Sequence, residues 1–274
     1  MLSQDQLQTP FMAQLCEMAD RIVHGERLAQ WREPVDELSP EYRERICYWM
    51  RRHGLTEASG GPAFFNMVPL VPSARAAEHL CHIAAEELAH GRMNLEPLRD
   101  FGYDPDAIFQ SRWSMTPEDE WEQLRLGPSR HENRSGGFET VIAFTMLIDP
   151  MGLLVVCERV LSNYGPWARA NAAVFQDEKG HAAFWERWGM EYIESDEGHS
   201  KVQQAIDGMF ASTLGGLGRP AAEDSDFQRD HALGIRTHDG DEYRRILKGM
   251  LRPTFDTLGF NLPEVEPTYE SILL

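Results

Sequence analysis

Lysine is scarce in this chain of 274 residues, and negative charge dominates it. Only three of the 26 basic residues are lysine, at Lys179, Lys201 and Lys248, against 44 acidic residues, so the formal net charge is −18. Proteins that bind nucleic acids neutralise phosphates with lysine and arginine. The charge balance therefore argues against a nucleic-acid partner and against an anionic membrane surface. An anionic substrate would be met mostly by arginine.

Cysteine is also scarce, and the four that occur are far apart in the chain. Cys16, Cys47, Cys81 and Cys157 have neither the spacing of zinc ligands nor the density of a disulfide framework. We expect buried free thiols in a reducing cytosol. The sequence also has no cysteine set for an iron–sulfur cluster and no glycine-rich dinucleotide fingerprint.

Targeting and membrane-spanning signals are missing by the usual criteria. The N-terminal stretch MLSQDQLQTPFMAQ has no basic region followed by an apolar run, so no signal peptide is expected. The most apolar run, Ile142 to Cys157, is short for a membrane span and is interrupted by Asp149-Pro150. We therefore expect a cytoplasmic protein without a membrane partner.

Helical signals fill the sequence, and β-hairpin signals and short-period repeats are absent from it. Hydrophobic residues make up 42% of the chain, with seven Trp and 13 Phe, which is enough for a substantial core. Ser39 and Ser73 have the form of helix N-caps, and Gly60-Gly61-Pro62 is expected to end the first long helix. The predicted helices are 11–31 in part, 40–59, 73–101, 138–163, 166–194, 198–214 and 239–258, the last kinked or broken at Pro253. The predicted fold class is all-α, in one domain over residues 1–274, with a core bundle at about 39–194 and C-terminal helices at 198–260.

Two Glu-x-x-His tetrads lie on helix faces that are otherwise apolar. Glu178 and His181 share a face with Trp185, and Glu87 and His90 occupy the corresponding place on an earlier helix. Burial of an unpaired carboxylate is costly, and this tetrad is how di-iron bundles point two ligands inward from one helix. With 27 Glu and 10 His, composition alone would produce about one such tetrad. The tetrads by themselves are therefore weak evidence.

An inward-facing carboxylate upstream of each tetrad completes a set of six. Glu57 precedes Glu87 by 30 residues, and Asp149 precedes Glu178 by 29. Two antiparallel helices joined by a short turn produce about this spacing when their ligands meet at one level. A di-iron bundle takes one carboxylate from each of two helices and Glu-x-x-His from each of the other two. The pattern predicts a two-fold metal site made of Glu57, Glu87, His90, Asp149, Glu178 and His181.

Each predicted carboxylate ligand has a purely structural alternative. Glu57 lies near the predicted helix end and would be exposed if that end frayed. Asp149 stands before Pro150, as a helix N-cap would. Glu87 and Glu178 would be solvent-facing if only the histidines were buried.

Other acidic residues near the tetrads have different expected roles. Glu86 and Asp177 are candidates for acceptors of hydrogen bonds from the ligand histidines. Asp196 and His199 repeat the spacing within a stretch that is predicted to be a polar loop, and we interpret this repeat as a coincidence.

Several stretches around these residues resemble one oxygenase family. They are Leu147-Ile148-Asp149, the run from Tyr164 to Ala170 (YGPWARA), the tetrad Glu178 to His181, and the C-terminal stretches Gly240 to Arg245 and Thr257 to Gly259. Over roughly residues 40–262 the chain is similar to the catalytic subunit of the bacterial phenylacetyl-CoA 1,2-epoxidases, of the phenylacetate catabolic family. The resemblance implies a ferritin-like four-helix bundle with flanking helices, and it carries the same six ligands over to this chain.

The resemblance also implies an activity and its cofactors. Two iron ions, O2 and electrons from a separate reductase would place one oxygen atom on a small, aromatic substrate, with ring epoxidation of an aryl-CoA thioester as the leading expectation. The alternatives are a stand-alone hydroxylase or N-oxygenase acting on a non-CoA molecule, a non-catalytic partner subunit, and a ferroxidase. A homo- or hetero-oligomer is expected. Trp167, Phe175 and Trp185 either wall the substrate pocket or belong to the core.

Overall fold

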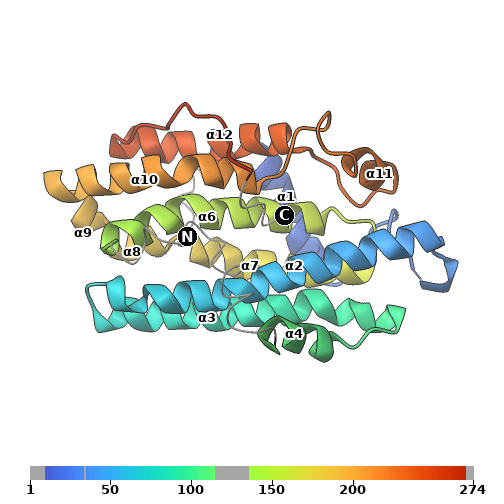
Figure 1. The fold of residues 1–274 in the computed structure, drawn as a ribbon. Helices are drawn as coiled ribbons and strands as arrows, with labels where there is room; N and C mark the ends of the chain where they lie inside the picture. Colours follow the sequence, from blue (N-terminus) through green and yellow to red (C-terminus); the bar gives the residue numbers. More distant parts are fainter. Residues whose placement is uncertain (1–9, 34, 115–135, 270–274) are drawn as a thin grey trace.

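The computed structural model describes residues 10–33, 35–114 and 136–269, and over these ranges the chain is helical, with no β-sheet. The predicted all-α fold is confirmed. Four long helices form a bundle of two antiparallel hairpins, α2 with α3 and α6 with α7 (Figure 1). Their bounds are α2 (Pro40–Met67), α3 (Ala74–Leu95), α6 (Phe138–Val160) and α7 (Gly165–His181). This arrangement is the expected ferritin-like bundle.

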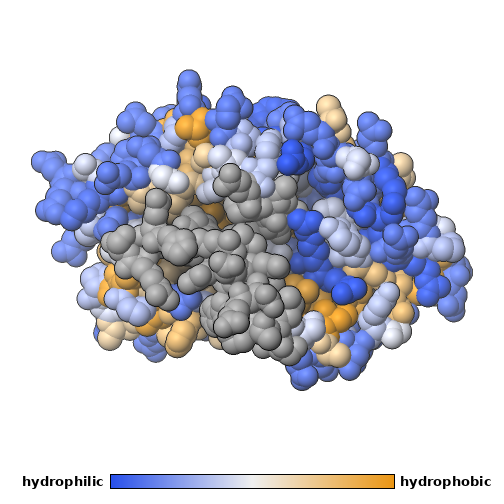
Figure 2. All heavy atoms as spheres, viewed as in Figure 1, coloured by the Kyte–Doolittle hydropathy of each residue, from blue (hydrophilic) through white to orange (hydrophobic). Residues whose placement is uncertain are grey.

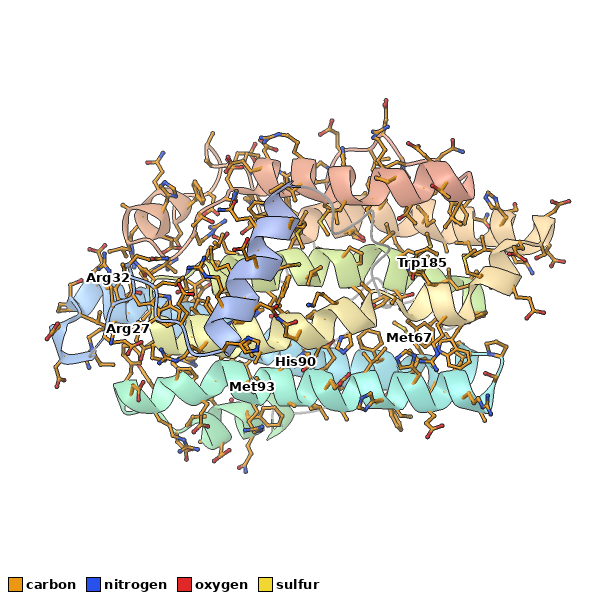
Figure 3. All side chains as sticks on the ribbon, turned by 180° about the vertical axis from the view of Figure 1, so that it is seen from behind. Arg27, Arg32, Met67, His90, Met93 and Trp185 are labelled. Atoms are coloured by element: carbon orange, nitrogen blue, oxygen red, sulfur yellow. The ribbon has the colours of Figure 1, made fainter. Side chains whose placement is uncertain are left out.

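Flanking helices cover the bundle on the side of α6 and α7. The helices α10 and α12 lie over α6 (Figure 1), and α1 crosses α6 and α7 on the face turned toward the viewer in Figure 3. The other elements are α1 (Pro10–Val23), α4 (Pro105–Ser114), α8 (Phe184–Trp188), α9 (Met190–Ile193), α10 (Asp196–Gly216), α11 (Phe227–Ala232), α12 (Gly240–Leu258) and 3₁₀ turns at Val35–Glu37, Val68–Leu70 and Glu96–Phe101. The C-terminal helices therefore make α6 the central layer.

The helix starts follow local capping chemistry. The side chains of Ser39 and Ser73 each accept a hydrogen bond from a backbone N–H three residues later, at 3.2 Å in both cases. These bonds satisfy amides that the first helical turn leaves unpaired. At α12, Asp239 and Glu242 form a reciprocal capping box. Both predicted serine caps are confirmed.

The helix α2 does not end at Gly60-Gly61-Pro62, so that prediction was wrong. It continues to Met67, with Pro62 inside it. A proline within a helix removes one backbone hydrogen bond, but tight packing against α3 favours the continuation here. A β-carbon at Gly61 would lie 2.8 Å from Cγ of Leu88 and 3.0 Å from the carbonyl oxygen of Ala84. The glycines serve the close approach of two helices instead of ending one.

The fourth predicted helix, 166–194, is not continuous, which is a second correction. The helix α7 ends at His181, and the chain turns at Ala182 and Ala183 before the short helices α8 and α9. Phe184 and Trp185 are buried immediately after this turn, where α8 packs against α6. Core packing, and not local helix propensity, sets this bend.

Proline does not interrupt α6 or α12; Pro253 was expected to kink or break the last helix, and it does not break it. The helix α6 runs through Pro150 and α12 runs through Pro253. The helix α6 is long and apolar enough to cross a membrane by length and composition, contrary to its expected shortness. However, 89% of its most apolar window is buried inside the protein. It is the core helix of the bundle, as its position in Figure 1 shows.

The surface and the cysteines agree with the composition. The face drawn in Figure 2 is largely hydrophilic, and its apolar side chains occupy separate patches. The four cysteines are free, as expected, but only Cys47 and Cys157 are buried. Cys16 is half-buried and Cys81 is exposed, so the expectation of burial was wrong for these two. The acidic and aromatic sequence of residues 100–132 predicts a loop with short helices, and α4 lies within it. Residues 115–135, which include most of the polar stretch at 130–137, lie outside the described residues.

Candidate metal centre

Close packing of α2 against α3 places the first three predicted ligands in the bundle interior. A β-carbon at Gly91 would lie 2.7 Å from the carbonyl oxygen of Gly54 and 2.8 Å from the backbone nitrogen of Ala58. Larger residues at these positions would force the helices apart. The small residues thus bring Glu57 of α2 to the level of His90 on α3, about one turn from Glu87.

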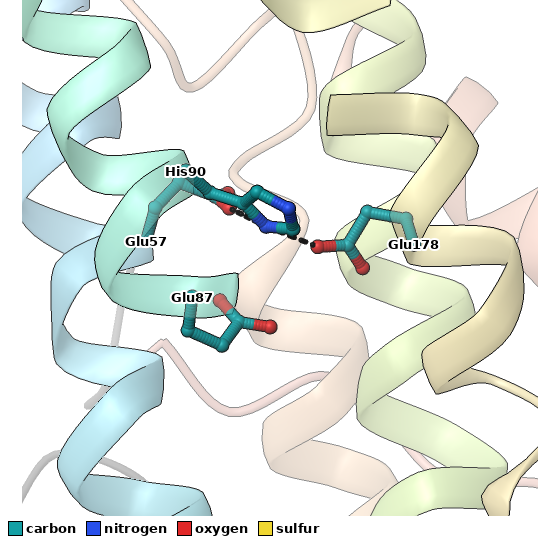
Figure 4. Close-up of side chains that lie close together, drawn as sticks. All are labelled: Glu57, Glu87, His90 and Glu178. Carbon is teal, nitrogen blue, oxygen red and sulfur yellow. Dashed lines mark ion pairs between the residues drawn. The ribbon is translucent and has the colours of Figure 1, made fainter. Parts of the chain in front are cut away.

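Four of the six predicted ligands form a tight group at the centre of the bundle. Glu57, Glu87, His90 and Glu178 each offer one ligand atom, and these atoms all lie within 4.8 Å of one another. Nδ1 of His90 lies 3.2 Å from Oε1 of Glu178 and 3.7 Å from Oε2 of Glu57, as the dashed lines in Figure 4 mark. All four residues are buried. Figure 3 shows His90 between α3 and α7, midway along the bundle.

His181 and Asp149 lie beside this group. Nδ1 of His181 is 3.1 Å from Oε1 of Glu87 and 3.6 Å from Oε1 of Glu178, and its ring stacks on that of His90 with centroids 5.5 Å apart. Asp149 is only 4% exposed, and its Oδ2 has no hydrogen-bond partner. The structure thus brings the donor atoms of five predicted ligands, all except Asp149, close to one another. Asp149 is buried nearby, outside the tight group.

The structural alternatives for the carboxylates do not hold. Glu57 is 8% exposed and lies well inside α2, away from any fraying end. Asp149 is in the middle of α6 and caps nothing. Glu87 and Glu178 are buried. Asp196 and His199 lie at the start of α10 and not in the polar loop that was predicted there, and Nε2 of His199 donates to the backbone oxygen of Leu258 at 3.0 Å.

Each inner histidine is held from outside by a carboxylate on the opposite helix. Nε2 of His90 on α3 donates to Oδ2 of Asp177 on α7 at 3.2 Å, and Nε2 of His181 on α7 donates to Oε2 of Glu86 on α3 at 3.0 Å. The predicted acceptor role of these two acids is confirmed. Ligand histidines are commonly oriented in this way. Each ring therefore turns Nδ1 inward, where it has no hydrogen-bond partner.

The electrostatics of the group reflect four acids buried together. Burial raises the pKa of Glu57, Glu87 and Asp149, and repulsion from neighbouring carboxylates raises it further. Burial acts in the same direction on Glu178, but the charges of His181 and His90 lower its pKa overall. Acids buried together in this way are the kind of group that a cation would satisfy.

The same carboxylates also raise the pKa of the two imidazoles, because negative charge nearby stabilises the protonated ring. Burial disfavours the charged ring of His90, yet its contacts with Glu178 and the charges of Glu57 and Glu87 raise its pKa to about 9. Burial also opposes the charge of His181, and Glu178, Glu86 and Glu87 raise its pKa to about 12. Without a metal ion, protons on these two rings partly neutralise the group.

The donor set fits a metal ion by its chemistry. Two inward Nδ1 atoms and the Oδ2 atom of Asp149 are buried without hydrogen-bond partners, and buried polar atoms normally have one. Carboxylate oxygens with two imidazoles suit first-row divalent metals such as iron. The residues present could therefore hold a metal ion.

A family model described as "Phenylacetic acid catabolic protein" matches residues 12–271. The chain belongs to the phenylacetic acid catabolic protein family. A comparison with curated proteins found no match. The match confirms the resemblance seen in the sequence at the level of the family. The buried group of Glu and His residues described above fits a di-iron site.

A polar network that the sequence analysis did not predict lies behind Glu57. Nε2 of His53 lies 3.1 Å from Oδ1 of Asn171 and 3.5 Å from Oε1 of Glu57. Asn94 Oδ1 accepts hydrogen bonds from Nε1 of Trp167 and Nδ2 of Asn171, both at 2.8 Å. The available signal was the spacing of four from His53 to Glu57 and from His90 to Asn94. This network fixes the outer side of the group.

Aromatic rings close the group on several sides. Trp167 and Phe175 are fully buried, and the ring of Trp167 meets that of His53 edge to face at 6.1 Å. Phe64, which lies beyond the predicted helix end at residue 59, is inside α2, and its ring centroid is 6.2 Å from that of His181. The Phe64 ring thus lies beside the predicted ligand His181, and the Trp167 ring lies beside His53, which contacts Glu57.

Proposed function

We propose that this protein is a di-iron, O2-dependent monooxygenase. The observation that carries the proposal concerns His90 and His181. The Nε2 atom of each donates to a carboxylate on the opposite helix, and each Nδ1, which has no hydrogen-bond partner, faces the group of buried carboxylates. Di-iron carboxylate bundles use this donor set. Family membership supports the same conclusion.

The six predicted residues have distinct roles in this proposal. Glu57 and Asp149 each supply one carboxylate, and the two Glu-x-x-His tetrads supply the remaining ligands. When bound, two iron ions would supply the capacity to react with O2 after reduction. Glu86 and Asp177 hold the two imidazoles so that Nε2 keeps its proton and Nδ1 stays free. Trp167 and Phe64 keep the site dry.

The substrate class proposed is a small aromatic molecule, and ring epoxidation of an aryl-CoA thioester is the leading candidate. Membership of the phenylacetic acid catabolic family supports this choice. The buried aromatic rings next to His53 and His181 also suit an aromatic substrate. A stand-alone hydroxylase or N-oxygenase remains the second candidate.

Electrons come from a separate reductase, because the sequence has no site for a dinucleotide or an iron–sulfur cluster. We propose a cytoplasmic protein that works as a homo- or hetero-oligomer.

Metal content is the first test. Protein purified without oxygen and loaded with Fe(II) should hold about two irons per chain, and Glu178→Ala should lose them. Glu191→Ala, at an exposed acid of α9, is the matched control and should keep both. A wild-type chain that stays free of iron after loading would contradict the proposal.

Oxygen consumption separates the functional candidates. With a generic reductase, uptake that depends on an aryl-CoA and not on the free acid supports the thioester epoxidase. Uptake with a non-CoA molecule supports the hydroxylase or N-oxygenase. Iron-loaded protein that oxidises Fe(II) without any substrate dependence indicates a ferroxidase. Iron binding without turnover in any of these assays indicates a non-catalytic partner subunit.

A further inference from the structure

A cavity rich in arginine lies apart from the metal centre. Its volume is about 230 Å³. It is lined by residues of α2, α6, the segment after α10 and the start of α12. The helix α11 lies near these elements, at one end of the bundle (Figure 1). Its charged lining consists of Arg52, Arg159, Arg219, Arg236, Glu158, Asp224 and Asp226. Four cations face three anions in a chain whose net charge is −18. We call this cavity the arginine pocket.

Three of the guanidinium groups converge on one indole ring. The Cζ atoms of Arg159, Arg236 and Arg52 lie 4.8, 5.3 and 5.7 Å from the ring centroid of Trp49. The indole N–H points elsewhere, to Oδ2 of Asp230 at 2.8 Å. The ring face attracts each cation, but it does not neutralise three positive charges held so close together.

The acids of the pocket are already engaged. Glu158 accepts hydrogen bonds from the backbone and hydroxyl of Thr237 and from the Tyr243 hydroxyl. Asp224 pairs with Arg236 at 2.7 Å. Asp226 lies 3.1 Å from Arg45, on the far side. Arg52 and Arg159 are thus left without a carboxylate within ion-pair distance in the described part of the chain.

Arg159 is the most unusual of these residues. It is 3% exposed, and its Nε has no hydrogen-bond partner. Charged side chains are almost never buried to this extent without a partner. Burial lowers the pKa of Arg159, and the nearby charges of Arg236 and Arg52 lower it further, against the opposing effect of Glu158. An anion between these guanidinium groups would relieve both the burial cost and the repulsion.

We propose that the arginine pocket binds a small organic oxyanion, a carboxylate or phosphate ester on an aromatic body. The planar guanidinium groups of Arg52 and Arg159 match the geometry of such an anion. Trp49, Val155 and Leu217 give the pocket apolar walls for the rest of the molecule. Its volume is below the range of about 300–1,000 Å³ for drug-sized ligands, so the guest is small.

The pocket is spatially separate from the metal centre. Arg52 lies five residues before Glu57 on α2, and Arg159 lies ten residues after Asp149 on α6, which are about 7.5 and 15 Å along the helix axes. Trp167 and His53 stand between the two sites, since Arg159 lies over the Trp167 ring at 5.4 Å and His53 contacts its edge. Binding in the pocket does not require iron, so it stands or falls independently of the proposed oxygenase activity.

Calorimetric titration of the metal-free, full-length protein tests the proposal. The probes are benzoate, phenyl phosphate and the neutral benzamide, at constant ionic strength. Arg159→Gln and Arg52→Gln remove one guanidinium each, and Arg51→Gln, at the exposed neighbour on α2, is the matched control. Loss of a charged hydrogen-bonding partner should weaken binding about 10- to 100-fold. Circular dichroism checks folding, and the half-buried Arg52 carries the test if Arg159→Gln unfolds.

The outcomes are distinct. Saturable binding of benzoate or phenyl phosphate, weakened in Arg159→Gln and Arg52→Gln but not in Arg51→Gln, supports the proposal, and the tighter probe tells whether the natural group is a carboxylate or a phosphate ester. The same binding in Glu178→Ala shows that the pocket is independent of the metal. Absence of saturable binding, equal binding of benzamide, or unchanged affinity in both pocket variants would overturn the proposal.

Discussion

A β-carbon at Gly60 would lie 2.5 Å from Oε2 of Glu87, so the carboxylate of α3 occupies the space beside α2 where a side chain would stand. The glycine is in the interior of α2, where this residue type weakens a helix. Its presence is explained by the room it leaves for the carboxylate. The position of Glu87 in the metal-binding group therefore depends on the absence of a side chain on the neighbouring helix.

Substitution of Gly60 by alanine should separate helix stability from metal binding. Alanine favours the helical conformation by about 0.5–1 kcal/mol relative to glycine, but its methyl group would displace the Glu87 carboxylate. We expect Gly60→Ala to remain folded and to bind Fe(II) at least about tenfold more weakly, a loss of about 1.4 kcal/mol. Gly208→Ala, at a position of α10 with open space around it, is the control. Unchanged iron affinity in Gly60→Ala would contradict the dependence of the Glu87 position on this glycine.

The outer carboxylates should tune metal affinity without binding the metal. Glu86→Ala and Asp177→Ala each remove the acceptor that orients one imidazole. Substitutions of this kind reduce metal affinity by about 10–100-fold. Competition with a chelator measures this loss, and the exposed Glu78→Ala on α3 should leave the affinity unchanged. A pair of variants with wild-type affinity would mean that the rings are held in place by packing alone.

Asp149 should be needed for only part of the bound metal. It lies outside the tight group of Glu57, Glu87, His90 and Glu178 and is the least engaged of the six predicted ligands. We expect Asp149→Ala to lower the iron content from about two ions per chain to about one, as measured by elemental analysis of desalted protein. Asp149→Asn, which keeps an oxygen donor but not the charge, should retain more iron. Full iron content in Asp149→Ala would remove Asp149 from the ligand set.

The metal-free protein should lose stability as the pH rises. His90 and His181 have folded-state pKa values of about 9 and about 12, whereas an unfolded histidine titrates near about 6.5. Their contribution to stability is complete below the unfolded pKa and is lost as the pH rises through the folded pKa. The raised pKa values of Glu57, Glu87 and Asp149 act with the same sign. The lowered pKa values of Glu178, Glu86 and His53 act against them.

Thermal unfolding followed by circular dichroism measures this dependence. The Tm of metal-free protein should fall by several degrees between pH 6.5 and 9, because each unit of pKa difference corresponds to about 1.4 kcal/mol. Iron-loaded protein should show a smaller change, since the metal ions replace the protons on the two rings. A flat profile for the metal-free form would indicate that the histidines are neutral there.

Much of the site could be predicted from the chain alone because its pattern is periodic. The tetrads, their upstream carboxylates at separations of 30 and 29 residues, and Glu86 and Asp177 all follow from which positions share a helix face. The serine caps of α2 and α3 are likewise local. The caps and the tetrads depend on neighbours within a few residues, and the upstream carboxylates repeat at nearly equal separations, so the order of amino acids shows both directly.

Only the tertiary structure decided how far the helices run and what surrounds the ligands. Gly60-Gly61-Pro62 has the local form of a helix end, but contact with α3 carries α2 onward, and the burial of Phe184 and Trp185 ends α7 early. The cross-pairing of Glu86 with His181 and the convergence of Arg52, Arg159 and Arg236 on Trp49 join segments of the chain that are far apart. The amino-acid order by itself determined which helix faces are polar inside an apolar core. Close packing between helices determined the boundaries and the partners, because the energies of burial outweigh local backbone preferences of about 1–3 kcal/mol.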